Sequence, residues 1–211
     1  MAIEKKKFLS VKIPLINKEI ELLGLSVEDF EGRFVKFDMT SDLRGKSLEL
    51  RTKVKVSDGK AEANVLEAYL LGYYIRRMMR KGTDYVEDSF LVQCKDHQVR
   101  IKPFLITRKR VSRQIRSALR EIAKKEIIEY VKDKTFENLV LDMINNKIQK
   151  ELNIKLKKIY PLGLCEIRFI GIEDSKEYKG EVEEVQEVEE KKKPAKTKKK
   201  KEVEEKGEEA E

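Results

Sequence analysis

The segment that most constrains the fold of this chain is a basic helix predicted at residues 108–125, which read RKRVSRQIRSALREIAKK. Eight of these residues are Lys or Arg, and only one is acidic. Val111, Ile115, Leu119 and Ile122 recur every three or four positions, which places them on one side of a helix. Any fold that contains this helix must bury that side in a core and leave a strongly basic side outside.

The basic side of this predicted helix indicates a polyanionic partner. Ordinary surface helices mix charges of both signs and gain stability from Glu–Lys pairs four residues apart, which this segment can hardly form. Like charges without partners repel each other, so they favour a chain that binds nucleic acid. A merely solvated basic face remains the alternative. The residues that recur on this side are Lys109, Arg113, Arg116, Arg120 and Lys124.

The charge of the whole chain divides unevenly along its length. Charged residues make up 41% of the chain and the formal net charge is +8. Residues 173–211 carry −4, so residues 1–172 carry +12. A body this basic is expected to seek nucleic acid or an anionic membrane surface. The membrane is disfavoured, because no apolar run approaches the roughly 18 residues of a spanning helix, and the N-terminus does not read as a signal peptide.

No motif in the sequence indicates catalysis, a metal or a cofactor. Residues 44–47 (Arg-Gly-Lys-Ser) resemble the end of a phosphate-binding P-loop, but Thr40 stands where that motif needs glycine. His97 is the single histidine and lies at a predicted hairpin turn; with Cys94 and Cys165 it cannot form a typical zinc site. We interpret the two cysteines as buried free thiols in a reducing, cytoplasmic setting. The chain is therefore predicted not to be an enzyme.

A carboxylate-metal nuclease is the one catalytic alternative left open, although no spacing singles out its candidate ligands. These are Asp38, Asp42, Asp84 and Asp96.

Apolar periodicity predicts an α+β fold: a mixed or antiparallel β-sheet or partial barrel with about three packed helices. Predicted strands cover residues 8–25 (one strand or a hairpin), 34–39, 48–56, 86–106 (a hairpin with its turn at 95–98) and 159–172. Pro103 marks an edge or a bulge in this hairpin. Besides the basic helix, predicted helices cover residues 61–81, ended by Gly82, and a segment capped by Thr135 that extends through Ile148.

Three regions follow from this pattern: residues 1–17 as a basic N-terminal arm and first strand, 18–174 as an α+β domain, and 175–211 as a disordered, charged C-terminal tail. The lysine block of the tail could bind nucleic acid or only keep the chain soluble. Further cations stand on the outer face of the strand at 48–56 and at the end of the helix at 61–81. In that helix Tyr73 and Tyr74 could stack on bases, but their spacing favours the core.

Four segments resemble the S3Ae family of small-subunit ribosomal proteins of archaea and eukaryotes. The segments are Ile159-Tyr160-Pro161-Leu162 with the following Glu166-Ile167-Arg168, residues 95–103, Arg76-Arg77, and residues 26–43. The resemblance spans residues 18–172, about three quarters of the chain. Family members have Asp-Gly where this chain has Asp96-His97, and their basic N-terminal extension is shortened here to an arm.

The resemblance implies a structural, non-catalytic protein on the platform of the small ribosomal subunit, near the messenger exit. Its expected partners are small-subunit rRNA and neighbouring platform proteins, with no membrane and no cofactor. Without the resemblance, the residues alone predict a basic nucleic-acid binder, and a free RNA-binding or RNA-chaperone protein or a module for an acidic protein partner remain alternatives. The predicted RNA-binding residues are Lys6, Lys7, Arg51, Lys53, Lys55, Arg76, Arg77, Arg80, Lys81, Arg108, Lys109, Arg110, Arg113, Arg116, Arg120 and Lys124.

Overall fold

The computed structural model describes residues 6–43, 45–57 and 59–173, and the predicted tail at 175–211 lies outside the described residues. The strands are β1 (Lys7–Ile13), β2 (Lys18–Gly24), β3 (Phe34–Asp38), β4 (Leu48–Ser57), β5 (Lys60–Leu70), β6 (Tyr85–Glu87), β7 (Phe90–Gln93), β8 (Gln98–Thr107) and β9 (Leu162–Ile172). The helices are the short 3₁₀ helix η1 (Glu28–Phe30), α1 (Gly72–Met78), α2 (Arg113–Lys132), α3 (Phe136–Ile144) and α4 (Lys147–Leu156).

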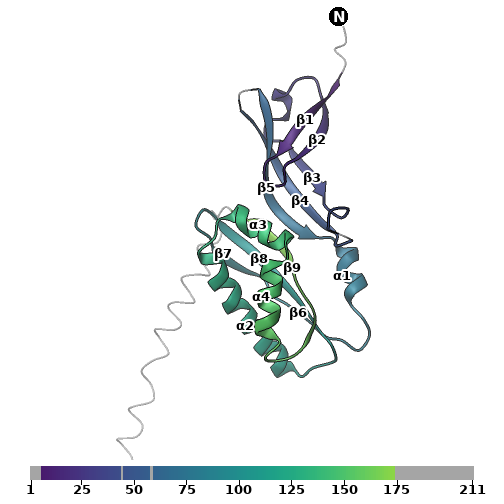
Figure 1. Ribbon diagram of the computed structural model, residues 1–211, viewed down its shortest axis with the longest axis vertical. Coiled ribbons are helices and arrows are strands. Elements are labelled where there is room, and N and C mark those ends of the chain that lie inside the picture. Colours follow the sequence, from purple (N-terminus) through teal and green to yellow (C-terminus); the bar gives the residue numbers. More distant parts are fainter. Residues whose placement is uncertain (1–5, 44, 58, 174–211) are drawn as a thin grey trace, which may run out of the picture. The chain divides into compact units, whose positions relative to one another are not determined.

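All described strands belong to one mixed sheet, which confirms the predicted α+β class (Figure 1). Its main path runs β2-β1-β5-β9-β8-β6; β4 also pairs with β5, β3 pairs with β4, and β7 pairs with β8. Only β1 and β5 pair in parallel, through Lys12 and Glu62, and the other pairs are antiparallel. The long strand β5 joins the two parts of the sheet, because it pairs with β4 along its length and with β9 at its end.

A small core lies between the β1–β2 hairpin, η1 and the adjoining parts of β4 and β5. Val11, Ile13, Phe30 and Val54 are almost completely buried there. Gly24 is needed at the end of β2, because an added Cβ would lie 2.6 Å from two ring atoms of Phe30. This contact lets the aromatic ring close one end of the core.

A larger core lies where α2, α3 and α4 cover one face of β7, β8 and β9 (Figure 1). The core side of α2 consists of Leu119, Ala123, Ile127 and Val131, four residues apart and each at most 1% exposed. Spacing of four residues keeps side chains on one side of a helix. Within the described residues, these three helices lie on one face of the strands and leave the opposite face uncovered.

The predicted strands and turns are largely confirmed. Residues 8–25 form the β1–β2 hairpin, β3 and β4 lie where they were expected, and the turn at 95–98 joins β7 to β8. The register between β8 and β9 shifts at Pro103, which is the predicted bulge. Proline is compatible with a bulge because it has no backbone N–H, and a bulge already interrupts the hydrogen bonds between the two strands.

The helix predicted at residues 61–81 is wrong over its first half. Residues 60–70 form β5, and only Gly72–Met78 are helical. Buried Ala61 and Ala63 alternate with exposed Glu62 and Asn64, the pattern of a strand. Pairing with three neighbouring strands overrides the helical preference of alanine and leucine. Gly82 does have the left-handed φ of 84°, but it follows the helix by four residues.

The boundaries of two other predicted helices also differ. The basic helix begins only at Arg113, where the Ser112 hydroxyl accepts a hydrogen bond from the Ile115 amide, and it continues to Lys132. The helix predicted after Thr135 is divided into α3 and α4. The division falls at Asn146, whose φ of 58° is left-handed and cannot continue a right-handed helix.

Candidate nucleic-acid interface

Asp84 holds the loop before β6 against the loop before α2. The Thr107 amide donates to the Asp84 carbonyl oxygen at 2.9 Å, and the Asp84 amide donates to the Thr107 hydroxyl at 3.1 Å. The Asp84 carboxylate accepts from the Val111 amide at 2.9 Å. Arg80 and Lys81 in the first loop are thereby brought beside the second loop, although the two loops lie far apart in the sequence.

The turn between α4 and β9 reaches the same end of the sheet. Leu162, the first residue of β9, pairs with Thr107, the last residue of β8. The exposed Lys157 and Lys158 belong to this turn and precede the Ile159-Tyr160-Pro161-Leu162 segment. Sequence reasoning missed both lysines. Their position just before a predicted strand was the only available signal, and it did not reveal which loops the strand would meet.

The three loops, together with Arg113 at the start of α2, form what we call the basic rim. All eight side chains of the rim are exposed, and within the described residues none lies at ion-pair distance from a carboxylate. The carboxylate of Asp84, in the first of these loops, accepts a hydrogen bond from the Val111 backbone amide. The rim is therefore an area of one sign of charge. Its members are Arg80, Lys81, Arg108, Lys109, Arg110, Arg113, Lys157 and Lys158.

Three other predicted cations of the basic helix lie along α2 beyond the rim. Arg120 and Lys124 are exposed, and the Lys124 ammonium lies 5.8 Å from the centre of the Phe90 ring. Arg116 differs from the prediction of a fully outward side chain. It is half-buried, and its Nε atom is buried without a partner among the described residues. The buried side of α2 contains Leu119 and Ala123, so it lies closer to the predicted basic side than expected, and Arg116 is partly enclosed.

The cations of β4 are largely engaged within the protein. The Arg51 guanidinium lies 3.7 Å from the Glu67 carboxylate and 4.8 Å from the centre of the Phe34 ring. The Lys53 ammonium lies 5.9 Å from the same ring, and Lys55 is exposed. This strand therefore presents less free positive charge than its sequence indicates.

Arg51 also lines an open groove of about 970 Å³, which we call the sheet groove. It lies on the face of the sheet that the helices leave uncovered, because Ile101 and Ile170 face the helical core and the adjacent Lys102 and Phe169 point the other way. Both signs of charge line the groove. Its cations are Lys36, Arg51, Lys102 and Arg168, and its acids are Glu67, Glu87 and Asp88.

Tyr69 lines the sheet groove beside these charges. Burial raises the pKa of its hydroxyl to about 12, and a hydrogen bond to Glu49 acts in the same direction. The hydroxyl therefore stays protonated in neutral solution and acts as a donor.

The remaining predicted cations are not gathered into the rim. The Arg77 guanidinium donates to the Gly45 carbonyl oxygen at 3.1 Å, whereas Arg76 is exposed on α1. Lys6 and Lys7 lie at the open end of the β1–β2 hairpin. Tyr74 is buried, as predicted, but Tyr73 is 47% exposed.

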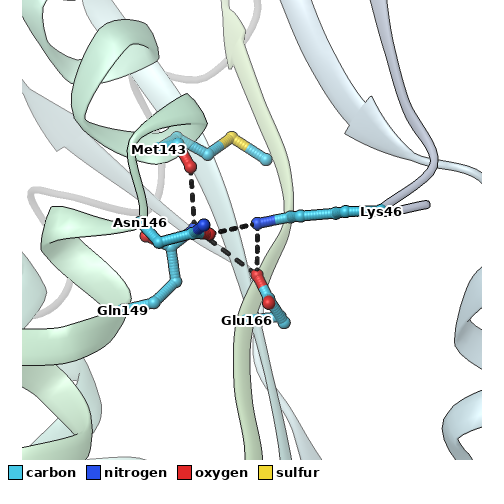
Figure 2. A network of polar contacts seen from close by, with 5 residues as sticks. All are labelled: Lys46, Met143, Asn146, Gln149 and Glu166. Atoms are coloured by element: carbon cyan, nitrogen blue, oxygen red, sulfur yellow. Dashed lines mark hydrogen bonds and ion pairs between the residues drawn. The ribbon is translucent and has the colours of Figure 1, made fainter. Parts of the chain in front are cut away.

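Lys46 of the P-loop-like segment lies in a buried polar cluster (Figure 2). Its ammonium contacts the Glu166 carboxylate at 2.7 Å and the Asn146 side-chain oxygen at 2.6 Å. Gln149 donates to the Met143 carbonyl oxygen at 3.0 Å and to Glu166 at 3.4 Å. The cluster joins the loop before β4 to the α3–α4 junction and β9. Lys46 is therefore a structural cation, and it is not presented to a phosphate.

The cysteines are buried free thiols, as predicted. Burial raises the pKa of the Cys94 thiol to about 11 and that of the Cys165 thiol to about 12, so neither is an activated nucleophile. His97 is exposed in the β7–β8 turn. Among the described residues, no group of His, Cys, Asp or Glu could hold a metal ion. No helix of the described ranges is long and apolar enough to span a membrane.

Comparison with protein families matches residues 2–175 to the model of the Ribosomal S3Ae family. The chain belongs to this family. The matched range contains both the basic rim and the sheet groove.

Archaeal relatives extend the same result. The small ribosomal subunit protein eS1 of Nanoarchaeum equitans is 30% identical over 185 residues, covering 83% of this chain and 92% of the relative. The eS1 protein of Methanothermobacter thermautotrophicus is 29% identical, covering 62% and 68%. That of Haloarcula marismortui is 25% identical, covering 86% and 89%. Ribosomal S3Ae relatives are thus matched over most of their own length.

Proposed function

We propose that this protein is a structural component of the small ribosomal subunit, supports translation there, and binds rRNA mainly through the basic rim. The rim is the observation that carries the proposal, together with membership of the Ribosomal S3Ae family. Relatives that cover most of the chain are named small ribosomal subunit proteins. The ribosome is accordingly its proposed location, in the cytoplasm, and no catalytic role is proposed.

The electrostatics of the rim support a phosphate ligand. The eight exposed cations, which have no carboxylate partner among the described residues, repel one another. An RNA backbone relieves this repulsion, and release of its condensed counterions contributes to binding. Arginine donors suit phosphate oxygens in a forked geometry, and lysines act as point charges. Recognition of this kind follows the shape of the RNA more than its sequence.

Other exposed cations extend the proposed interface beyond the rim. Arg120 and Lys124 continue the rim along α2, and Arg76 and Lys55 are exposed and available for further contacts. The arm with Lys6 and Lys7 adds a separate contact. We propose residues 18–174 as the rRNA-binding domain and the platform near the messenger exit as its place, with neighbouring platform proteins as partners.

Sedimentation of ribosomal subunits tests the proposal. A tagged chain expressed in an archaeal host should migrate with the small subunit in a sucrose gradient, at about one copy per subunit. A rim variant with Arg108, Lys109 and Arg110 all changed to Gln should shift toward the top of the gradient. A matched triple change of exposed lysines on α4, the β1–β2 hairpin and the start of β5 (Lys150, Lys12 and Lys60 to Gln) should stay with the subunit. A wild-type chain that remains free of subunits would contradict the proposal.

A free RNA-binding or RNA-chaperone protein would fail the sedimentation test but would still bind purified RNA. A module for an acidic protein partner would fail both. The gradient followed by an RNA-binding measurement therefore distinguishes the three functions.

A further inference from the structure

The sheet groove differs from the basic rim in the balance of its charges. Three cation–carboxylate pairs stand in or beside it: Arg51 with Glu67 at 3.7 Å, Arg168 with Glu87 at 3.3 Å, and Lys36 with Glu49 at 3.7 Å. Charges paired in this way already neutralise each other. A groove lined like this gains little from a phosphate chain, because each phosphate near a cation would also approach a carboxylate.

Two charges of the groove have no partner of opposite sign among the described residues. The Lys102 ammonium lies 4.8 Å from the centre of the Phe169 ring, and no carboxylate lies at ion-pair distance. The Asp88 carboxylate accepts a hydrogen bond from the Ser89 amide at 2.8 Å but meets no cation. The groove thus offers one free charge of each sign, together with the aromatic side chains of Phe169 and Tyr69.

We infer that the sheet groove receives an extended segment of a neighbouring protein of the small subunit. The segment would place a carboxylate against Lys102, a basic side chain against Asp88, and an apolar side chain against Phe169. Protein interfaces combine both signs of charge with aromatic contacts, whereas a surface for the RNA backbone has one sign, as the rim has. The volume of about 970 Å³ accommodates several side chains. This inference rests on the proposed ribosomal function.

Photo-cross-linking inside the assembled subunit tests the inference. A benzophenone amino acid replaces Ser89 in the groove or, as the comparison site, Lys109 in the rim, and the tagged small subunits are purified and irradiated. Mass spectrometry then identifies what is attached to each site. We expect a peptide of another ribosomal protein at Ser89 and an rRNA nucleotide at Lys109.

Charge variants show whether that attachment depends on the groove. Lys102→Glu and Asp88→Lys should each lower the yield of the Ser89 cross-link at least fivefold. Lys150→Glu, an exposed charge reversal on α4, should leave the yield unchanged. Melting curves of the three free variants check that each still folds. The two reversals change different side chains of the groove, Lys102 on β8 and Asp88 between β6 and β7, so loss of folding in one leaves the other as the test.

Three results would overturn the inference: an rRNA cross-link at Ser89, no cross-link at Ser89 in irradiated subunits, or a protein cross-link whose yield neither reversal changes. In each case an rRNA cross-link at Lys109 would leave the proposed function standing. If the chain is absent from the subunits altogether, the proposed function and this inference both fail.

Discussion

Lys46 and the cations of the basic rim are the same kind of side chain in opposite surroundings. Lys46 is 7% exposed and has two oxygen partners within 2.7 Å, from residues 100 and 120 positions away in the sequence. The rim side chains are exposed and have no carboxylate partner among the described residues. Burying a cation destabilises the folded protein unless the cation keeps its partners. An exposed cluster of one sign is destabilised by repulsion between its charges, which a bound polyanion relieves.

The difference separates charges that stabilise the fold from charges available for binding. The sheet groove stands between the two, because its charges are partly exposed but mostly paired. If this distinction holds, mutations at the three places should have graded effects on the free energy of unfolding, and only those in the rim should change the binding of RNA.

The largest loss of stability is expected for Lys46→Met. Removing the ammonium leaves the Glu166 carboxylate, whose side chain is 11% exposed, without its cation. Breaking a buried ion pair from one side costs about 3–5 kcal/mol. Urea unfolding monitored by circular dichroism measures this difference.

Lys12→Met is the matched control, because Lys12 pairs with Glu19 at 3.2 Å while both side chains remain more than half exposed. Its cost should be about 0–1 kcal/mol. Similar losses in the two variants would show that burial does not distinguish these cations.

The next largest effect is expected on the core side of α2. Leu119 is completely buried, so Leu119→Ala should lower the free energy of unfolding by about 2–5 kcal/mol through lost contacts and a cavity. Arg113→Ala, at the exposed start of the same helix, should change stability by less than about 0.5 kcal/mol. Equal losses would mean that the sides of the helix are wrongly assigned.

Much of the fold could be predicted because its strands alternate clearly. β4 shows buried Leu48, Leu50 and Val54 between charged residues, and the β7–β8 hairpin has a polar turn. The helix predicted at 61–81 failed because β5 also pairs with β1 and β9, which are distant in sequence, and periodicity within one segment cannot reveal such partners. The division between α3 and α4 at Asn146 was missed because the apolar stripe continues across it.

The candidate site was only partly predictable, because its loops are assembled by tertiary contacts. Arg108, Lys109 and Arg110 stand out in the sequence, but their meeting with Lys157 and Lys158 depends on the register of β8 and β9. Lys46 was considered only as part of a failed phosphate motif, since nothing near it in sequence indicates Glu166 as a partner. Composition counts cations; it does not say which are already paired.

A smaller effect is expected in the sheet groove. Arg168 and Glu87 lie 3.3 Å apart, and both side chains are at least 40% exposed, so their attraction is screened by water. Arg168→Gln should therefore lower the free energy of unfolding by about 0–1 kcal/mol. It should also leave affinity for isolated rRNA within about twofold of wild type. Thermal melting and a filter-binding assay measure the two quantities, and a large loss of RNA affinity would place phosphate contacts in the groove.

The smallest effect on stability and the clearest effect on binding are expected in the rim. The deciding measurement is a salt titration of affinity for a small-subunit rRNA platform fragment, with Arg110→Gln, Arg113→Gln and, as control, Arg168→Gln. Logarithmic affinity should fall linearly with logarithmic salt concentration. Each rim variant should melt close to wild type and reduce the slope by about one unit or slightly less, and the control should not. Unchanged slopes in both folded rim variants would contradict the assignment of the basic rim as the rRNA-binding surface.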